Sequence, residues 1–122
     1  MKQQLRTEEE RQKEIKREMA RLNQKFSGLE PKTKKAVASL IENAAFMAAT
    51  LSELREEINL NGTTEEYQNG ENQRGIKKSA AVEVYTSLSK NHMTVMKQLT
   101  DLLPKDVKPE KDDGFDSFVK NK

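Results

Sequence analysis

The chain has no cysteine and no tryptophan among its 122 residues. The absence of cysteine excludes a disulfide framework, a thiolate metal site and a cysteine nucleophile. Aromatic residues make up only 5% of the sequence, and hydrophobic residues make up 34%, the same share as charged residues. A single chain of this size and composition builds only a small core, so the composition favours assembly with other subunits.

Long apolar runs are missing as well. No stretch approaches the roughly 20 apolar residues that a transmembrane helix needs. The N-terminal residues are charged from Lys2 onward and lack the apolar centre of a signal peptide. The sequence therefore predicts a soluble cytoplasmic protein with no membrane partner.

Positive charge is concentrated near the N-terminus, although the net charge is only +2. Residues 1–35 hold 11 lysines and arginines against 6 acidic residues, whereas residues 36–60 hold 1 against 4. The remaining residues, 61–122, are balanced at 10 against 10. A basic N-terminal region of this kind can meet phosphate groups.

A first helix is predicted over residues 7–26. Thr7 and Glu10 have the spacing of a capping box, and the three consecutive glutamates of the first turn suit the helix dipole. Apolar residues follow a seven-residue rhythm from Ile15 onward and give the helix one apolar face. Because Leu5 is the only apolar residue upstream of Ile15, we expect the first turns to project from the body or to fray.

A second helix is predicted from Pro31, a residue suited to the first helical position, to about Leu60. A third is predicted from Ser79, a natural N-cap, to Pro104. Two long helices of matched length favour an antiparallel helical hairpin. Both carry apolar residues at heptad spacing, and in the third helix this spacing also includes Val95 and Leu102. The residues expected to form the oligomerisation surface are Val37, Leu40, Ala44, Met47, Leu51, Leu54 and Ile58 in the second helix, and Tyr85, Leu88, His92 and Leu99 in the third.

The connector between these helices, residues 61–78, is longer than a tight turn requires. Asn69-Gly70 is the preferred pair for a type I′ turn and lies between two short polar stretches. The segment is therefore predicted as a short β-hairpin in which Gly75 could form a bulge. A flexible loop is the alternative.

The last residues, 105–122, alternate in charge and have no apolar periodicity, which predicts disorder in isolation. Within them, Phe115 and Phe118 are flanked by aspartates at positions 112, 113 and 116. An aromatic pair in acidic surroundings is a common form of docking peptide. The alternative is a solvated end with incidental phenylalanines.

Residues 31–104 resemble the small terminase subunit of tailed bacteriophages. The most specific part of the resemblance is the connector "NGTTEEYQNGENQRGIKKS", which joins an alanine-rich helix to a helix that ends in "LTDLLP". In such sequences the connector's serine is often followed by proline, whereas Ser79 here precedes Ala80, a difference that changes a helix start and not the fold. The resemblance implies a ring that binds double-stranded viral DNA and recruits and regulates the large terminase subunit, which carries the ATPase and nuclease.

Together these features predict an all-α, ring-forming protein of the host cytoplasm. Its parts are a basic N-terminal helix at 1–30, a helical hairpin for oligomerisation at 31–104 with the connector as an excursion, and the tail at 105–122. The tail's Phe115 and Phe118 are expected to dock on the large subunit. The expected DNA-binding residues are Arg11, Lys13, Lys16, Arg17, Arg21, Lys25, Lys32, Lys34 and Lys35.

Catalysis is not expected. His92 is the single histidine, no glycine-rich loop precedes a Lys-Ser/Thr pair, and the adjacent carboxylates Glu56-Glu57 and Glu65-Glu66 diverge. We therefore predict no metal, no cofactor and no small-molecule substrate. The alternative function is a coiled-coil adaptor or antitoxin-like regulator without a DNA role, in which the basic residues form a solvated face with pairs such as Glu9–Lys13.

Overall fold

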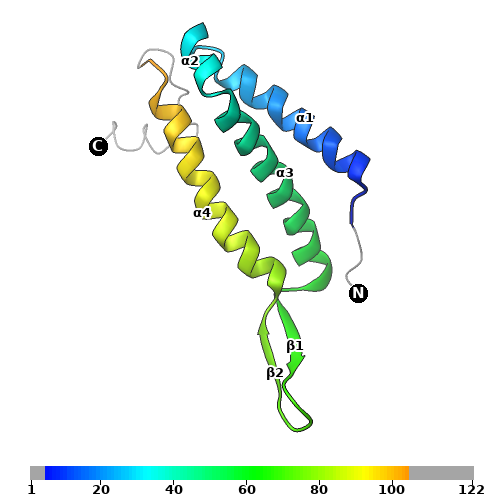
Figure 1. Cartoon of the computed structure of the whole chain (residues 1–122). Helices are drawn as coiled ribbons and strands as arrows, with labels where there is room; N and C mark the ends of the chain where they lie inside the picture. Colours follow the sequence, from blue (N-terminus) through cyan, green and yellow to red (C-terminus); the bar gives the residue numbers. More distant parts are fainter. Residues whose placement is uncertain (1–4, 105–122) are drawn as a thin grey trace, which may run out of the picture.

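The computed structural model describes residues 5–104 (Figure 1). In that range the elements follow the order α1 (Glu8–Lys25), α2 (Pro31–Ala36), α3 (Ala38–Asn61), β1 (Thr64–Gln68), β2 (Arg74–Lys78) and α4 (Ala80–Asp101). The chain is thus mostly helical, with a small antiparallel sheet between helices, as the sequence predicts.

Helix α3 lies between α1 and α4 and packs against both of them (Figure 1). The three long helices alternate in direction, so α3 and α4 form the predicted antiparallel hairpin. The two strands extend from the end of this hairpin, away from the helices (Figure 1). None of the helices within residues 5–104 is both long enough and apolar enough to cross a membrane.

Local capping signals confirm two predicted helix starts. The backbone N–H of Glu10 donates to Thr7 Oγ1 at 3.1 Å, and the N–H of Thr7 donates to Glu10 Oε1 at 3.2 Å, which completes the capping box of α1. The N–H of Val82 donates to Ser79 Oγ at 3.2 Å and caps α4. Each cap satisfies amide groups that have no carbonyl partner within the helix.

The second predicted helix is interrupted, so a single helix from Pro31 to Leu60 is wrong at one residue. Val37 separates α2 from α3 with φ −103° and ψ 13°. Its N–H still donates to the carbonyl of Thr33, and its own carbonyl accepts from the N–H of Ile41, both at 3.0 Å. Val37 is β-branched, which lowers helix propensity, and its side chain packs against the core. The break thus coincides with a β-branched residue that packs against the core.

The predicted β-hairpin is confirmed, but its predicted turn is wrong. Residues 69–73 form the loop, closed by the N–H of Asn69 donating to the carbonyl of Gln73 at 2.6 Å. A type I′ turn needs positive φ at both central residues. Gly70 has φ 83°, whereas every non-glycine residue in the described range has negative φ. The longer loop thus needs the left-handed conformation only at the glycine.

Gly75 forms no bulge, because the strand register runs without interruption from Thr64 opposite Lys78 to Gln68 opposite Arg74. Gly75 lies directly opposite Tyr67. A Cβ atom at position 75 would lie 2.7 Å from three atoms at the far end of the Tyr67 side chain. The glycine therefore lets the tyrosine ring lie flat across the neighbouring strand.

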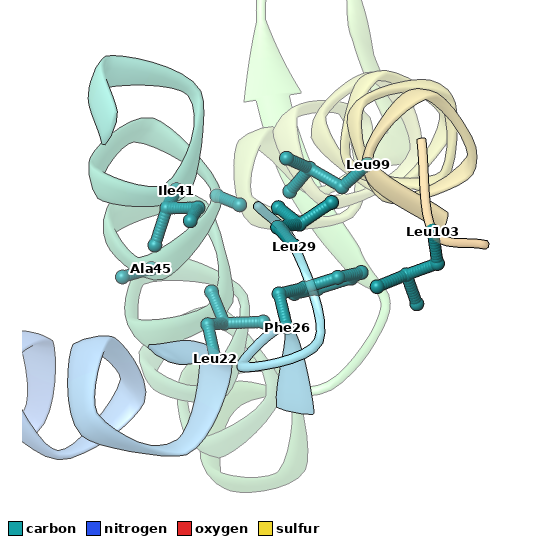
Figure 2. Close-up of a cluster of buried hydrophobic side chains, with 8 residues drawn as sticks. Leu22, Phe26, Leu29, Ile41, Ala45, Leu99 and Leu103 are labelled. Carbon is teal, nitrogen blue, oxygen red and sulfur yellow. The ribbon is translucent and has the colours of Figure 1, made fainter. Parts of the chain in front are cut away.

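The hydrophobic core lies where α1, α3 and α4 meet, at the end of the molecule away from the strands (Figures 1 and 2). Small residues on α3 let its two neighbours approach closely. The buried cluster consists of Leu22, Phe26, Leu29, Ile41, Ala44, Ala45, Leu99 and Leu103.

The heptad pattern does not describe the buried face of α3. Its buried residues are Ile41, Ala44, Ala45 and Ala49, a broader stripe that suits a helix with neighbours on two sides. At the end of α4, the C-cap residue Leu102 is 45% exposed, and the next residue, Leu103, is buried in its place.

The residues expected to form the oligomerisation surface fall into two groups. Ala44 and Leu99 have no exposed surface and belong to the core of the single chain. The others keep part of their surface in solvent: Val37, Leu40, Met47, Leu51, Leu54, Ile58, Tyr85, Leu88 and His92.

Candidate nucleic-acid interface

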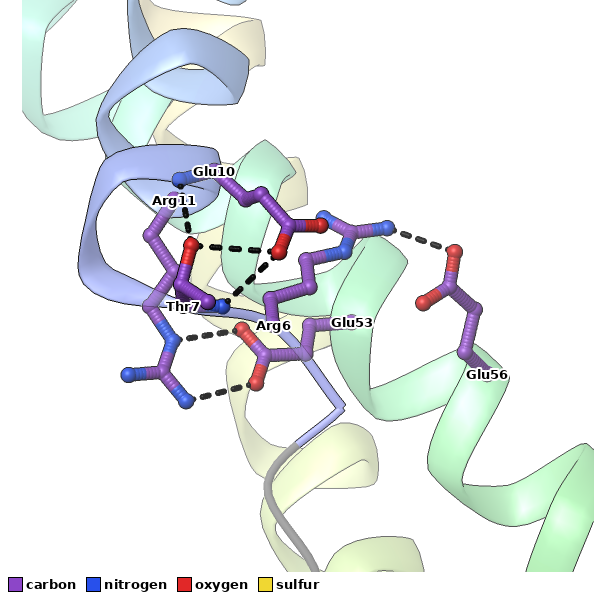
Figure 3. A network of polar contacts seen from close by, with 6 residues as sticks. All are labelled: Arg6, Thr7, Glu10, Arg11, Glu53 and Glu56. Carbon is purple, nitrogen blue, oxygen red and sulfur yellow. Dashed lines mark hydrogen bonds and ion pairs between the residues drawn. The ribbon is translucent and has the colours of Figure 1, made fainter.

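Arg11 is one of the predicted DNA-binding residues, but it is held by a carboxylate of α3. Its Nε and Nη2 donate to the two carboxylate oxygens of Glu53, each at 2.9 Å (Figure 3). Just before α1 begins, Arg6 Nη2 donates to Glu56 Oε1 at 2.7 Å and to Ser52 Oγ at 3.2 Å. We call these contacts the α1–α3 clamp. They hold the first turns of α1 against α3, so the expectation that these turns project or fray is wrong.

The clamp changes the acid–base properties of its members. Hydrogen bonds from Arg11 lower the pKa of the Glu53 carboxyl, and the same bonds raise the pKa of Arg11. The bond to Glu56 raises the pKa of Arg6. Bidentate arginine–carboxylate pairs are among the stronger polar contacts. The main role of Arg11 is therefore to hold α1 against α3.

Three further predicted residues lie beside carboxylates of their own helix. The nitrogen-to-oxygen distances are 4.0 Å for Lys13 and Glu9, 3.3 Å for Arg17 and Glu14, and 2.8 Å for Arg21 and Glu18. Such exposed pairs are weak, but each one balances a positive charge locally. Lys13, Arg17 and Arg21 therefore contribute little unbalanced positive charge.

The remaining five predicted residues have no carboxylate of the described chain within ion-pair distance. They are Lys16, Lys25, Lys32, Lys34 and Lys35. Lys25 is the last residue of α1, and the last three lie on α2. We call these four lysines (25, 32, 34 and 35) the basic end. The basic end lies at the end of the molecule away from the strands (Figure 1). In the turn between α1 and α2, Glu30 is the one acidic residue. The structure thus concentrates unbalanced positive charge at one end of the molecule.

A surface hollow of about 420 Å³ opens between α1 and α2 at this end. Buried Ile41 and partly buried Met19 contribute to its apolar floor. Lys34 and Lys35 stand among its lining residues. The full lining comprises Met19, Asn23, Pro31, Lys34, Lys35, Ala38 and Ile41, and we call it the basic-end groove.

Large apolar side chains are exposed at several other places. Tyr67 and Ile76 lie on the strands, where Glu65 and Lys77 form a cross-strand ion pair at 3.7 Å. On α4, Val84 lines a shallow hollow together with Leu88. Exposed apolar groups of this kind are candidates for contact with another subunit. The set is Phe46, Leu60, Tyr67, Ile76, Val84, Met93 and Leu102.

His92 faces the interior of the helical layer. Its Nε2 atom is buried and has no hydrogen-bond partner among the described residues. Desolvation by burial lowers the pKa of His92 below its ordinary value of 6.5, the charge of Arg21 lowers it further, and Glu18 acts in the opposite direction.

Two further predictions concern a metal site and the docking residues. Among residues 5–104, no group of three or more histidine, cysteine, aspartate or glutamate side chains is placed to hold a metal ion. The predicted docking residues Phe115 and Phe118 lie outside the described residues.

Sequence reasoning missed the α1–α3 clamp. Arg6 and Arg11 meet residues 50 and 42 positions away, respectively. Periodicity along one helix gives no signal for a contact over such a separation. Only the antiparallel packing of α1 on α3 brings these side chains together.

Comparisons of the chain with protein-family models, with curated proteins and with solved structures gave no match. The functional argument therefore depends on this chain's own residues.

Proposed function

We propose that this protein is the small, non-catalytic subunit of a bacteriophage terminase, acting in the host cytoplasm. The observation that carries the DNA-binding part is the basic end, where four lysines lie without carboxylate partners in the described chain. The resemblance of the connector to that of small terminase subunits supports the packaging role.

The basic end would bind DNA through its phosphates. Lysine side chains neutralise phosphate charge and release counterions, which gives affinity without base selectivity. One chain offers few such contacts. A ring would repeat the basic end around its circumference and so build a larger positive field.

Assembly and recruitment complete the proposal. The exposed apolar residues of α3, α4 and the strands would supply contacts between subunits in a homo-oligomeric ring. Phe115 and Phe118 would bind the large subunit, so that the ring holds DNA while the motor subunit is recruited. No small-molecule substrate or cofactor is needed for either task.

The DNA role is tested by the double variant Lys32→Gln/Lys35→Gln. We expect weaker binding to duplex DNA, and a plot of log affinity against log salt that is shallower by about 0.9 for each phosphate that the variant no longer neutralises. The matched control is Arg17→Gln/Arg21→Gln, which removes the same number of charges from residues that are already ion-paired. Its slope should change less.

The outcomes separate the alternatives. Equal reductions of affinity in the two variants would mean that binding follows total charge and not the basic end. If the unmodified protein fails to bind duplex DNA at low salt, the DNA role is wrong and the adaptor or antitoxin-like alternative takes its place.

A further inference from the structure

The basic-end groove is lined by both apolar and basic side chains. Its floor includes the apolar side chains of Met19 and Ile41. Lys34 and Lys35 line it too, and neither has a carboxylate partner in the described chain. A peptide with apolar rings next to acidic side chains would complement both properties.

The described part of the chain ends at residue 104, next to a residue of the core that adjoins this groove. Leu103 is buried in the same cluster as Phe26 and Ile41 (Figure 2), and Ile41 also contributes to the groove. Ile41 therefore belongs both to the core that Leu103 enters and to the groove. The end of the described chain and the groove are thus connected through one shared core residue.

The sequence that follows has the complementary composition. Residues 112–118 read "DDGFDSF", with three aspartates, two phenylalanines and no lysine or arginine. The eight residues from 105 to 112 can span at most about 26–29 Å when extended. This reach is more than twice the diameter of a helix with its side chains, about 10–12 Å, so we infer that the segment can arrive at the groove of its own chain.

We propose that residues 112–118 bind in the basic-end groove of the same chain. The rings of Phe115 and Phe118 contact the apolar floor, and the aspartates face Lys34 and Lys35. Because the segment is tethered, its local concentration at the groove is of the order of millimolar, which makes even a weak contact effective.

The consequence for DNA, unlike the docking itself, rests on the proposed function. A docked segment places carboxylates against two lysines of the basic end, so the segment and DNA compete. Binding of the phenylalanines by the large subunit would then release the lysines to DNA. The segment thus acts as an internal inhibitor that the partner removes.

Methyl NMR of the full chain tests the docking without DNA. Met19 lines the groove, whereas Met93 is exposed on α4 and is not among the groove's lining residues. The variant Phe115→Ala/Phe118→Ala should shift the Met19 methyl signal and leave that of Met93 unchanged. Val119→Ala, an apolar substitution just outside the segment, is the matched control and should move neither signal.

An unchanged Met19 signal in the double variant would overturn the docking. A Met19 shift that disappears on dilution would also overturn it, because the occupant would then be the segment of a second copy. A shift that persists at a dilution where native mass spectrometry shows single chains supports docking within one chain.

A second measurement tests the competition. If the segment occupies the groove for about 70–90% of the time, the double variant should bind duplex DNA about three- to tenfold more tightly. Unchanged DNA affinity, together with the Met19 shift, would overturn the inhibitory role. Failure of the unmodified protein and the variant alike to bind DNA would refute the proposed function, and the methyl result would still decide the docking.

Discussion

Leu99 and Leu102 differ sharply in environment although both follow the apolar spacing of α4. Leu99 has no exposed surface, whereas Leu102 is 45% exposed. We expect Leu99→Ala to lower the free energy of unfolding by about 2–5 kcal/mol, the cost of a cavity in a packed core. Leu102→Ala should change it by only about 0.5 kcal/mol. Urea unfolding followed by circular dichroism measures both, and equal effects would contradict this placement of the core.

His92 makes the stability of the fold depend on pH. Its pKa is lowered in the folded chain below the ordinary value of 6.5, mainly by burial. As pH falls below 6.5, the unfolded chain takes up this proton before the folded chain does. The free energy of unfolding therefore decreases as pH falls below 6.5 and is restored as pH rises again.

The variant His92→Leu tests this dependence. At pH 7.5 it should be at least as stable as the unmodified chain, because the buried Nε2 has no hydrogen bond to lose among the described residues. At pH 5.5 its advantage should grow. Since the chain has one histidine, urea unfolding at the two pH values isolates its effect, and parallel changes in both proteins would refute the assignment.

At the scale of the elements, the sequence predicted what depends on near neighbours. The Thr7–Glu10 capping box, the Ser79 cap and the hairpin strands all follow from residues close together in the chain, and all are confirmed. The break at Val37 was not predicted, because helical periodicity continues through this position and gives no signal for an interruption; its side chain packs against core residues that are distant in the sequence. The turn was also predicted wrongly. Asn69-Gly70 favours a two-residue turn, but the hairpin closes through a five-residue loop, residues 69–73.

The candidate site was predicted in part. Counting charges places the positive excess in residues 1–35, but cannot tell which charges are balanced. Arg11 is balanced by Glu53 through a contact 42 residues away in the chain, so the sequence overstated its availability. The lysines of α2 have no carboxylate within one helical turn that forms an ion pair, and they keep their predicted role in the proposal.

For the whole molecule, the position of the core explains why a partner is expected. The buried cluster lies where all three long helices meet, whereas the ends of α3 and α4 next to the strands have fewer buried side chains. Leu51, Ile58 and Leu88 remain partly exposed in these halves of the helices, and Met47 near the middle of α3 is partly exposed as well. A second subunit would bury this surface and add the apolar contact that one chain lacks.

Val84 offers a test of assembly that leaves the single chain folded. It is 52% exposed on α4 beside Leu88, so Val84→Asp should preserve the helical circular dichroism. In an assembled ring the same carboxylate would be removed from water without gaining a partner, which is costly. Native mass spectrometry should then show smaller species than for the unmodified chain.

Thr86→Asp is the matched control, because Thr86 is exposed on α4 about 200° around the helix from Val84. It adds the same charge on the opposite side of the helix and should leave the mass unchanged. Leu99→Asp could not serve here, since Leu99 lies in the core of one chain and its replacement would unfold the subunit itself. A monomer of the unmodified protein at micromolar concentration would refute assembly. A ring that withstands Val84→Asp would move the subunit contact away from this part of α4.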